Sequence, residues 1–284
     1  MIRRLLRIFS GFLTLILLIF VNFFYETRLR PTNSLKEWES FRLFAKPEFE
    51  KWSAFEFSFI KAFYYTLSLR VYMGKLAERY KEPPPFAHEP IVRTADVVSK
   101  ICPYYFDIYY IANGYLTWDY KDYNTAIRFL EFAVANNPSN YILYFFLGFD
   151  YFYFFKDYEK GAEYLIKASE ISGNPRFAHL ASKLLYASGR TEVAIGVLKA
   201  MIENTKDEGW KKQLKTRLKA LEAIYYLEKG VESYRERFGV FPKTLEDLLK
   251  VGIITEIPKD PYGGKFYIDE EGNIKTTSNL SYIK

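Results

Sequence analysis

Apolar and small side chains recur at helical spacing on both sides of a short polar turn in the middle of the chain. The pattern spans Asp107–Pro138, the turn covers Tyr120–Tyr123, and the closing proline ends the second helical stretch. Such a pattern predicts two antiparallel helices in contact. The small residues that we expect where these helices touch are Gly114, Ala126 and Ala133.

The same arrangement returns twice at a fixed interval. Gly148 lies 34 residues after Gly114, within the segment Tyr144–Tyr151, and Ser182 lies another 34 residues on. The second copy has its second helix one residue late, which predicts an insertion at the turn Phe155–Tyr158. A period of this length indicates repeated helix pairs. The further small residues expected at helix contacts are Gly148, Gly161, Ala168, Ser182 and Ala194.

These residues approximate the pattern W-x2-L-G-x2-Y…A-x3-F…P. Over roughly residues 95–207 the chain therefore resembles the tetratricopeptide repeat (TPR) family, and Ala95–Cys102 fits the second helix of a degenerate earlier repeat. The resemblance implies a mainly α-helical solenoid, in which each helix pair buries its apolar side against the next pair. It also implies a protein that binds other proteins along its first helices and has no catalytic residues of its own.

The resemblance places a candidate protein-binding groove on the first helices of two successive repeats. An open groove of such apolar side chains would be a large exposed patch, which soluble surfaces avoid. Two alternatives follow: the helix Trp52–Tyr80 of the same chain fills part of the groove, or the groove is open to a partner. The candidate groove residues are Ile108, Ile111, Tyr115, Trp118, Ile142, Phe145, Phe149 and Phe152.

Residues 31–86 are predicted to be helical and to pack on the repeats. Asn33–Glu37 has the form of a capping box, Pro47 predicts the start of the next helix, and Glu82–Pro85 predicts a stiff break. Apolar positions after Pro47 recur every three or four residues, as expected of a helix with one apolar side. These positions are Trp52, Phe55, Phe59, Phe63, Leu67 and Val71.

The first 30 residues predict a membrane anchor. Leu5–Phe24 contains one charge, Arg7, and its 20 residues at about 1.5 Å each span the roughly 30 Å hydrocarbon layer. Arg3 and Arg4 precede this segment, which favours a cytoplasmic N-terminus. No small residues suited to signal-peptide cleavage follow it. We therefore expect a single-pass protein of the inner membrane, with the bulk of the chain in the periplasm of a bacterium.

After the repeats, a long helix is predicted at Trp210–Arg237, with a basic face that we interpret as solvated. The glycine, proline and aromatic spacing at about residues 234–276 resembles the C-terminal part of the major pseudopilins of type II secretion. The pattern predicts a short helix after Pro242, a turn at Asp260–Gly264 and a β-hairpin pairing Lys265–Ile268 with Asn273–Thr276.

This C-terminal segment departs from the pseudopilin pattern in three ways. Phe241 stands in place of tyrosine, Tyr262 stands in place of tryptophan, and the family's calcium loop is missing, so we expect no metal site. A unit of about fifty residues is marginally stable alone. We therefore expect it to dock on the long helix rather than to move freely. The helix residues expected to receive it are Leu221, Tyr225 and Leu227.

Composition limits the possible functions. The 284 residues carry a net charge of +6 without a basic cluster interleaved with exposed aromatics, which argues against nucleic-acid binding. The single cysteine, Cys102, excludes an internal disulfide, and the distant pair His88 and His179 argues against a metal site. No phosphate-loop, dinucleotide or nucleophile-elbow motif occurs. We expect no enzyme activity, no cofactor and no small-molecule substrate.

Four segments are therefore predicted: a cytoplasmic tail and anchor (1–30), a helical segment (31–86), TPR-like repeats (87–207), and a long helix with a pseudopilin-like module (208–284). The expected function is a membrane-anchored scaffold that assembles a cell-envelope complex of a secretion or pilus type. The alternative is a pilin-like structural subunit. Gly11–Leu18 resembles the start of type IV prepilins, with an inserted Leu13 and without the family's glutamate.

Overall fold

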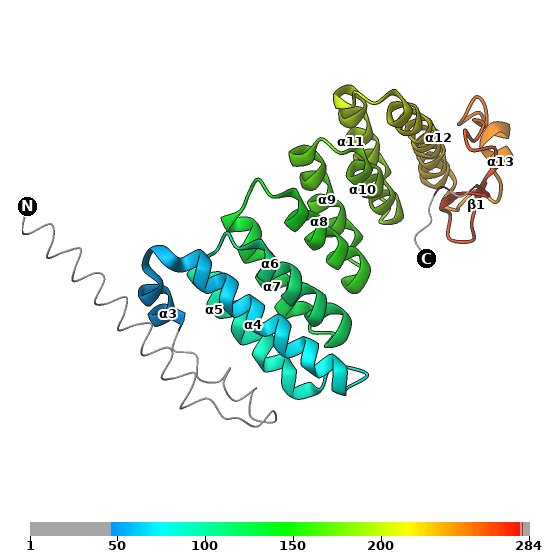
Figure 1. Cartoon of the computed structure of the whole chain (residues 1–284). Coiled ribbons are helices and arrows are strands. Elements are labelled where there is room, and N and C mark those ends of the chain that lie inside the picture. Colours follow the sequence, from blue (N-terminus) through cyan, green and yellow to red (C-terminus); the bar gives the residue numbers. More distant parts are fainter. Residues whose placement is uncertain (1–46, 279, 281–284) are drawn as a thin grey trace, which may run out of the picture. The chain divides into compact units, whose positions relative to one another are not determined.

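The computed structural model of the chain describes residues 47–278 and residue 280, and shows a mainly α-helical protein with a small two-stranded sheet near its C-terminus (Figure 1). Two compact units divide the chain, Met1–Thr125 and Ala126–Lys284. Within the described ranges, no helix is long and apolar enough to cross a membrane. The predicted anchor Leu5–Phe24 and the capping box Asn33–Glu37 lie outside the described residues.

The first unit is built on a pair of packed helices, α4 and α5. The short helix α3 packs on α5 as well, and it begins at Pro47 as predicted. The proline-rich break predicted at Glu82–Pro85 separates α4 from α5, so α4 and α5 form a helix pair before the first clear repeat. The elements are α3 (Pro47–Ala54), η3 (Phe55–Phe57), α4 (Ser58–Arg79), η4 (Pro85–Ala87), α5 (His88–Ile101), α6 (Phe106–Gly114) and η5 (Tyr115–Asp119).

The apolar positions that recur after Pro47 are not the ones that α4 buries against the described part of the chain. These positions are 44–67% exposed, from Leu67 at the low end to Trp52 and Phe55 at the high end. The helix instead buries a second row of side chains at helical spacing, Ala62, Thr66, Leu69, Met73 and Leu76. Ala62 is small, and Thr66 donates its hydroxyl to the Ala62 carbonyl at 2.8 Å, so the polar atom of this buried threonine is paired. Helix α4 is thus apolar on two sides, and only one of them is covered.

The second unit is a series of helices in which each of α8 to α12 packs on the next (Figure 1). This serial packing is compatible with a helical-repeat solenoid. The elements are α7 (Tyr123–Asn136, which begins in the first unit), α8 (Tyr141–Asp150), η6 (Tyr151–Phe155), α9 (Tyr158–Ser172), α10 (Pro175–Ala187), α11 (Thr191–Asn204), α12 (Glu208–Phe238), α13 (Leu245–Lys250), β1 (Phe266–Ile268) and β2 (Ile274–Thr276).

Small residues allow α8 and α9 to approach closely. A Cβ on Gly148 would lie 2.8 Å from Leu165 Cγ and 2.9 Å from the Gly161 carbonyl oxygen. A Cβ on Gly161 would in turn lie 2.9 Å from Phe152 Cβ. The other small residues predicted at contacts are fully buried, with one exception: Ala126, Ala133, Ala168, Ser182 and Ala194 each have 0% exposure.

Gly114 is the exception among the predicted contact residues. A Cβ there would meet no atom within 4 Å, and the residue is only half-buried, whereas its neighbours Ala112 and Asn113 are buried. The inward side of α6 therefore runs through Ala112 and Asn113, one to two residues before the position that the repeat spacing selects.

Both first helices end in a wider turn that the sequence pattern did not predict. Helix α6 continues into the π-helical turn η5, and α8 continues into the π-helical turn η6. After η6, Lys156 takes a left-handed conformation (φ 57°), and the Asp157 side chain then accepts the Lys160 N–H at 3.0 Å to cap α9. A left-handed residue also follows η5, at Lys121 (φ 55°), so these shared features do not account for the extra residue expected at Phe155–Tyr158.

The C-terminal module has the predicted elements. Gly239 ends α12 in a left-handed conformation (φ 73°), and Thr244 and Asp247 form a capping box at the start of α13. Strands β1 and β2 pair antiparallel, with Ile268 opposite Ile274. The module docks on α12, because its Leu248 and Ile254 join one buried cluster with the helix residues Leu221, Ile224, Leu227 and Val231, while Tyr225 is partly buried against it.

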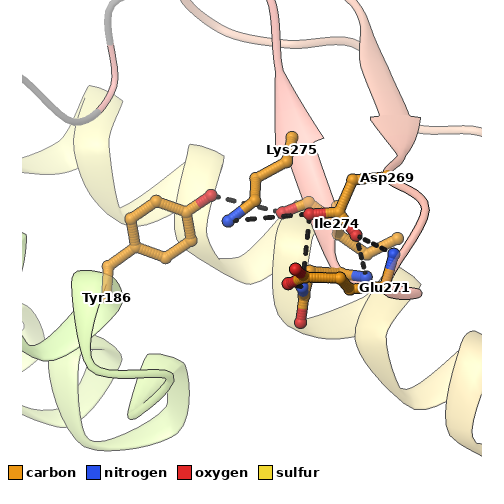
Figure 2. Close-up of polar contacts among 6 residues, drawn as sticks. Tyr186, Asp269, Glu271, Ile274 and Lys275 are labelled. Atoms are coloured by element: carbon orange, nitrogen blue, oxygen red, sulfur yellow. Dashed lines mark hydrogen bonds and ion pairs between the residues drawn. The ribbon is translucent and has the colours of Figure 1, made fainter.

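Polar contacts hold the hairpin against the repeats. Tyr186 of α10 donates its hydroxyl to the Ile274 carbonyl at 3.3 Å, and Figure 2 shows this contact beside the hairpin turn. Within the turn, Asp269 accepts the Asn273 N–H at 2.7 Å, which keeps the two strands in register. The hairpin is therefore attached both to α12 and to the last helix pair.

Candidate functional site

The candidate groove residues of the first unit divide into two kinds. Ile108 and Ile111 are buried, with 0% and 8% exposure, so they belong to the core and offer no surface to a partner. Tyr115 is half-buried, and Trp118 is 56% exposed. Both of the latter lie in η5, so of these four candidate residues only the two at the end of the first helix are accessible.

The candidate groove residues of the second unit form a continuous aromatic ridge along α8 and η6. We define this ridge as Phe145, Phe149 and Phe152, and all three, like the neighbouring Ile142, are half-buried. The ring of Phe149 lies 6.3 Å from that of Phe145 and 5.8 Å from that of Phe152, and Phe145 also contacts Phe177 of α10 at 5.4 Å. These side chains are thus held together by ring contacts while part of each stays accessible.

A second apolar surface lies on α3, η3 and α4. We call it the aromatic face and define it by side chains that are each 44–67% exposed. Trp52 is its centre, because its ring lies 5.9 Å from Phe49 and 5.6 Å from Phe55. Monomeric soluble proteins rarely expose so many large apolar side chains together, and such patches mark interaction sites. The members are Phe49, Trp52, Phe55, Phe59, Ile60, Phe63, Leu67 and Val71.

The exposure of the aromatic face is relevant to the two alternatives for the groove, which is either partly filled by the helix Trp52–Tyr80 or open to a partner. Within the first unit these side chains are exposed, so they do not fill the part of the groove that Ile108 to Trp118 would form. Helix α4 contacts the start of α6: the Phe59 ring lies 5.3 Å from Tyr105, which precedes α6, and Arg70 forms an exposed ion pair with Asp107 at 3.4 Å.

The potentially reactive side chains His88 and Cys102 take part in the packing and hydrogen bonding of the first unit. His88 lies 2.9 Å from Asp122, and the side-chain contacts of Asp122 outweigh its burial and lower its pKa. Cys102 is buried, and burial raises the pKa of its thiol. Among the described residues, no group of three or more histidine, cysteine or acidic side chains could hold a metal ion. The surfaces suited to recognition are therefore the aromatic ridge and the aromatic face.

Comparison with known proteins adds no assignment to this geometry. No protein-family model matches the chain, and no curated protein sequence matches it either.

Proposed function

We propose that this protein is a membrane-anchored, TPR-like scaffold that binds other proteins during assembly of a cell-envelope complex of the secretion or pilus type. The observation that carries the proposal is the close approach of α8 and α9 at Gly148 and Gly161, two positions selected by the 34-residue pattern. Serial packing of α8 to α12 supports it, because stacked helix pairs form extended binding surfaces.

The membrane part of the proposal rests on the apolar segment Leu5–Phe24 and on the aromatic face that follows it in sequence. Only 22 residues, 25 to 46, separate this segment from the aromatic face, so the aromatic face stays within reach of the bilayer in which the segment is anchored. Tryptophan and other aromatic side chains suit the membrane–water interface. We assign the aromatic face to the lipid surface and the aromatic ridge to the protein partner.

A photo-cross-linking experiment in native membranes tests the scaffold assignment. A photoreactive phenylalanine analogue at Phe145 or Phe152 should produce adducts with a discrete partner protein, because both side chains lie on the aromatic ridge. The matched control is Lys167, an α9 residue in an exposed ion pair with Glu170 at 3.1 Å. Equal adducts from Lys167, or none from either ridge position, would contradict a ridge-bound partner.

The second candidate function is a pilin- or pseudopilin-like structural subunit. The turn at Asp260 favours it, because the Asp260 side chain accepts the Tyr262 N–H at 2.8 Å and the Ser278 hydroxyl at 2.6 Å. A Cβ on Gly264 would lie 2.6 Å from the Ser278 nitrogen, so the turn requires glycine there. Intact-mass measurement distinguishes the two candidates: an unprocessed N-terminus supports the scaffold, and loss of the residues before Gly11 supports the subunit.

A further inference from the structure

Arg217 is a fully buried arginine whose side chain is not fully paired. It lies on α12 with 1% exposure. Its Nε donates to the Ser182 hydroxyl at 2.8 Å, and its Nη1 donates to the Leu280 carbonyl at 2.8 Å. Its Nη2 is buried and has no hydrogen-bond partner among the described residues. A buried charged group that keeps an unpaired donor is costly unless something else satisfies it.

Arg217 lines a cleft of about 320 Å³ between α10, α12 and the C-terminal module, together with Tyr262, whose hydroxyl interacts with the guanidinium. Three of the lining residues are cations, and none of the lining residues is a carboxylate. Lys183 and Lys212 form no ion pair with another residue in the described part of the chain. The lining residues are His179, Lys183, Lys212, Gln213, Thr216, Arg217, Tyr262 and Leu280.

The nearest groups do not neutralise this positive charge. Burial, and then the charges of Arg217 and Lys183, lower the pKa of His179 to about 4, so its imidazole is neutral at pH 7. The His179 Nδ1 atom is also buried without a partner. Asp260 is engaged in its own turn, where its Oδ2 accepts the hydroxyls of Thr276 and Ser278. The cleft therefore combines excess positive charge with unsatisfied polar atoms.

The arrangement of donors distinguishes between kinds of anion. Planar carboxylates are bound most strongly by two parallel N–H groups of one guanidinium, but Nε and Nη1 of Arg217 are already donating. A phosphate group has three strong acceptor oxygens and carries about −1.5 to −2 charges at pH 7. It can accept single hydrogen bonds from donors on different elements, here Lys183, Lys212 and Tyr262.

We propose that this cleft binds a phosphate group, either free phosphate or the phosphate of a small organic monoester. The phosphate contacts the ammonium groups of Lys183 on α10 and Lys212 on α12 and the Tyr262 hydroxyl, and the buried guanidinium of Arg217 adds its positive charge beneath them. Because these donors come from the last repeat helices and from the C-terminal module, the bound phosphate strengthens the docking of the module. This proposal does not depend on the identity of the scaffold's protein partner.

Binding is tested on the full chain in detergent at pH 7, by calorimetric titration with inorganic phosphate and, separately, with glycerol 3-phosphate. Sodium chloride and sodium acetate at matched ionic strength are the reference titrations. We expect saturable phosphate binding and a higher melting temperature in phosphate. Comparable affinity for the two phosphates indicates an organic monoester, and a clear preference for inorganic phosphate indicates the free ion. Acetate binding as tightly as phosphate would overturn the assignment.

Variants then locate the site. Lys183→Gln and Lys212→Gln should each weaken phosphate binding at least tenfold, because each removes one cation from the cleft. The matched control is Lys215→Gln with Lys219→Gln, which removes two exposed lysines of α12 that do not line the cleft. Equal loss in the control, or no loss in either cleft variant, would overturn the proposal. These lysines are not fully buried, so the test does not require the more disruptive replacement of Arg217.

Discussion

Gly230 of α12 lies directly against Ile254 of the C-terminal module, where a Cβ on the glycine would come within 2.9 Å of Ile254 Cγ2. The same Cβ would lie 3.3 Å from Leu248 Cδ1. Thr255 adds a polar contact nearby, because its N–H donates to the Tyr226 hydroxyl at 3.1 Å. The module is thus fitted to the helix at a site that accepts only glycine without movement.

Gly230→Leu should therefore loosen the module and lower stability by about 1–3 kcal/mol, the usual cost of overpacking a closed site. The control is Gly196→Leu on α11, where a Cβ would meet nothing within 4 Å. Thermal unfolding of the full chain in detergent measures the difference, and proteolysis of residues 239–280 reports release of the module. Equal melting temperatures for the two variants would rule out tight docking.

Gly148→Leu should be more damaging than Gly173→Leu. The first substitution forces a side chain into 2.8 Å of Leu165 and 2.9 Å of backbone, which should cost about 1–3 kcal/mol or more. Gly173 has open space around it, but its φ of 67° imposes a strain of about 1–2 kcal/mol on any other residue.

Gly196→Leu has neither penalty and provides the baseline for this comparison. The expected order of melting temperatures is Gly148→Leu lowest, then Gly173→Leu, then Gly196→Leu. If the Gly148 and Gly173 variants had the same melting temperature, the contact between α8 and α9 would be looser than the geometry indicates.

Stability should fall as the pH is lowered from about 6.5 to about 4, partly because of His179. Its pKa is about 4 in the folded chain and 6.5 in its ordinary state, so below pH 6.5 the unfolded chain binds a proton that the folded chain excludes. Because the ring is partly accessible, we expect about 1–3 kcal/mol from this residue. His179→Asn should reduce the difference between melting temperatures at pH 7 and pH 5. An unchanged difference would remove His179 as the cause.

The topology predicted from the basic N-terminus can be tested with a reporter that is active only outside the cytoplasm. Fused after Lys284, it should be active, because the arginines before residue 8 favour a cytoplasmic N-terminus. A fusion that is well expressed but inactive would reverse the orientation of the chain.

Much of the arrangement of the helices was predictable from small residues at helix contacts and from residues that end helices. Gly148 and Gly161 mark the contact of α8 with α9 because glycine is needed where backbones nearly touch, and Gly239 marks the end of α12 because it adopts a left-handed conformation. The hairpin register also followed from its turn residues. These features are local, so a single sequence contains their signal.

The features that sequence reasoning missed depend on which neighbour covers a side chain. Periodicity showed an apolar row that on α4 runs through Phe59 and Phe63, but a second row through Ala62 and Leu69 has the same spacing and is the one that packs. Arg217 was overlooked because lysines surround it on α12. Its spacing from Leu214 and Leu221 places it on the buried side of the helix, which is the signal that could have identified it.

The central claim is a scaffold anchored to a membrane, with its aromatic face on the lipid surface. The most direct measurement is fluorescence quenching by spin-labelled lipids in vesicles containing full-length single-tryptophan variants. A chain with only Trp52 should be strongly quenched, because Trp52 lies at the centre of the aromatic face. A chain with only Trp210, on α12 in the second unit, should be quenched little. Equal quenching of the two, or none for Trp52, would contradict the account.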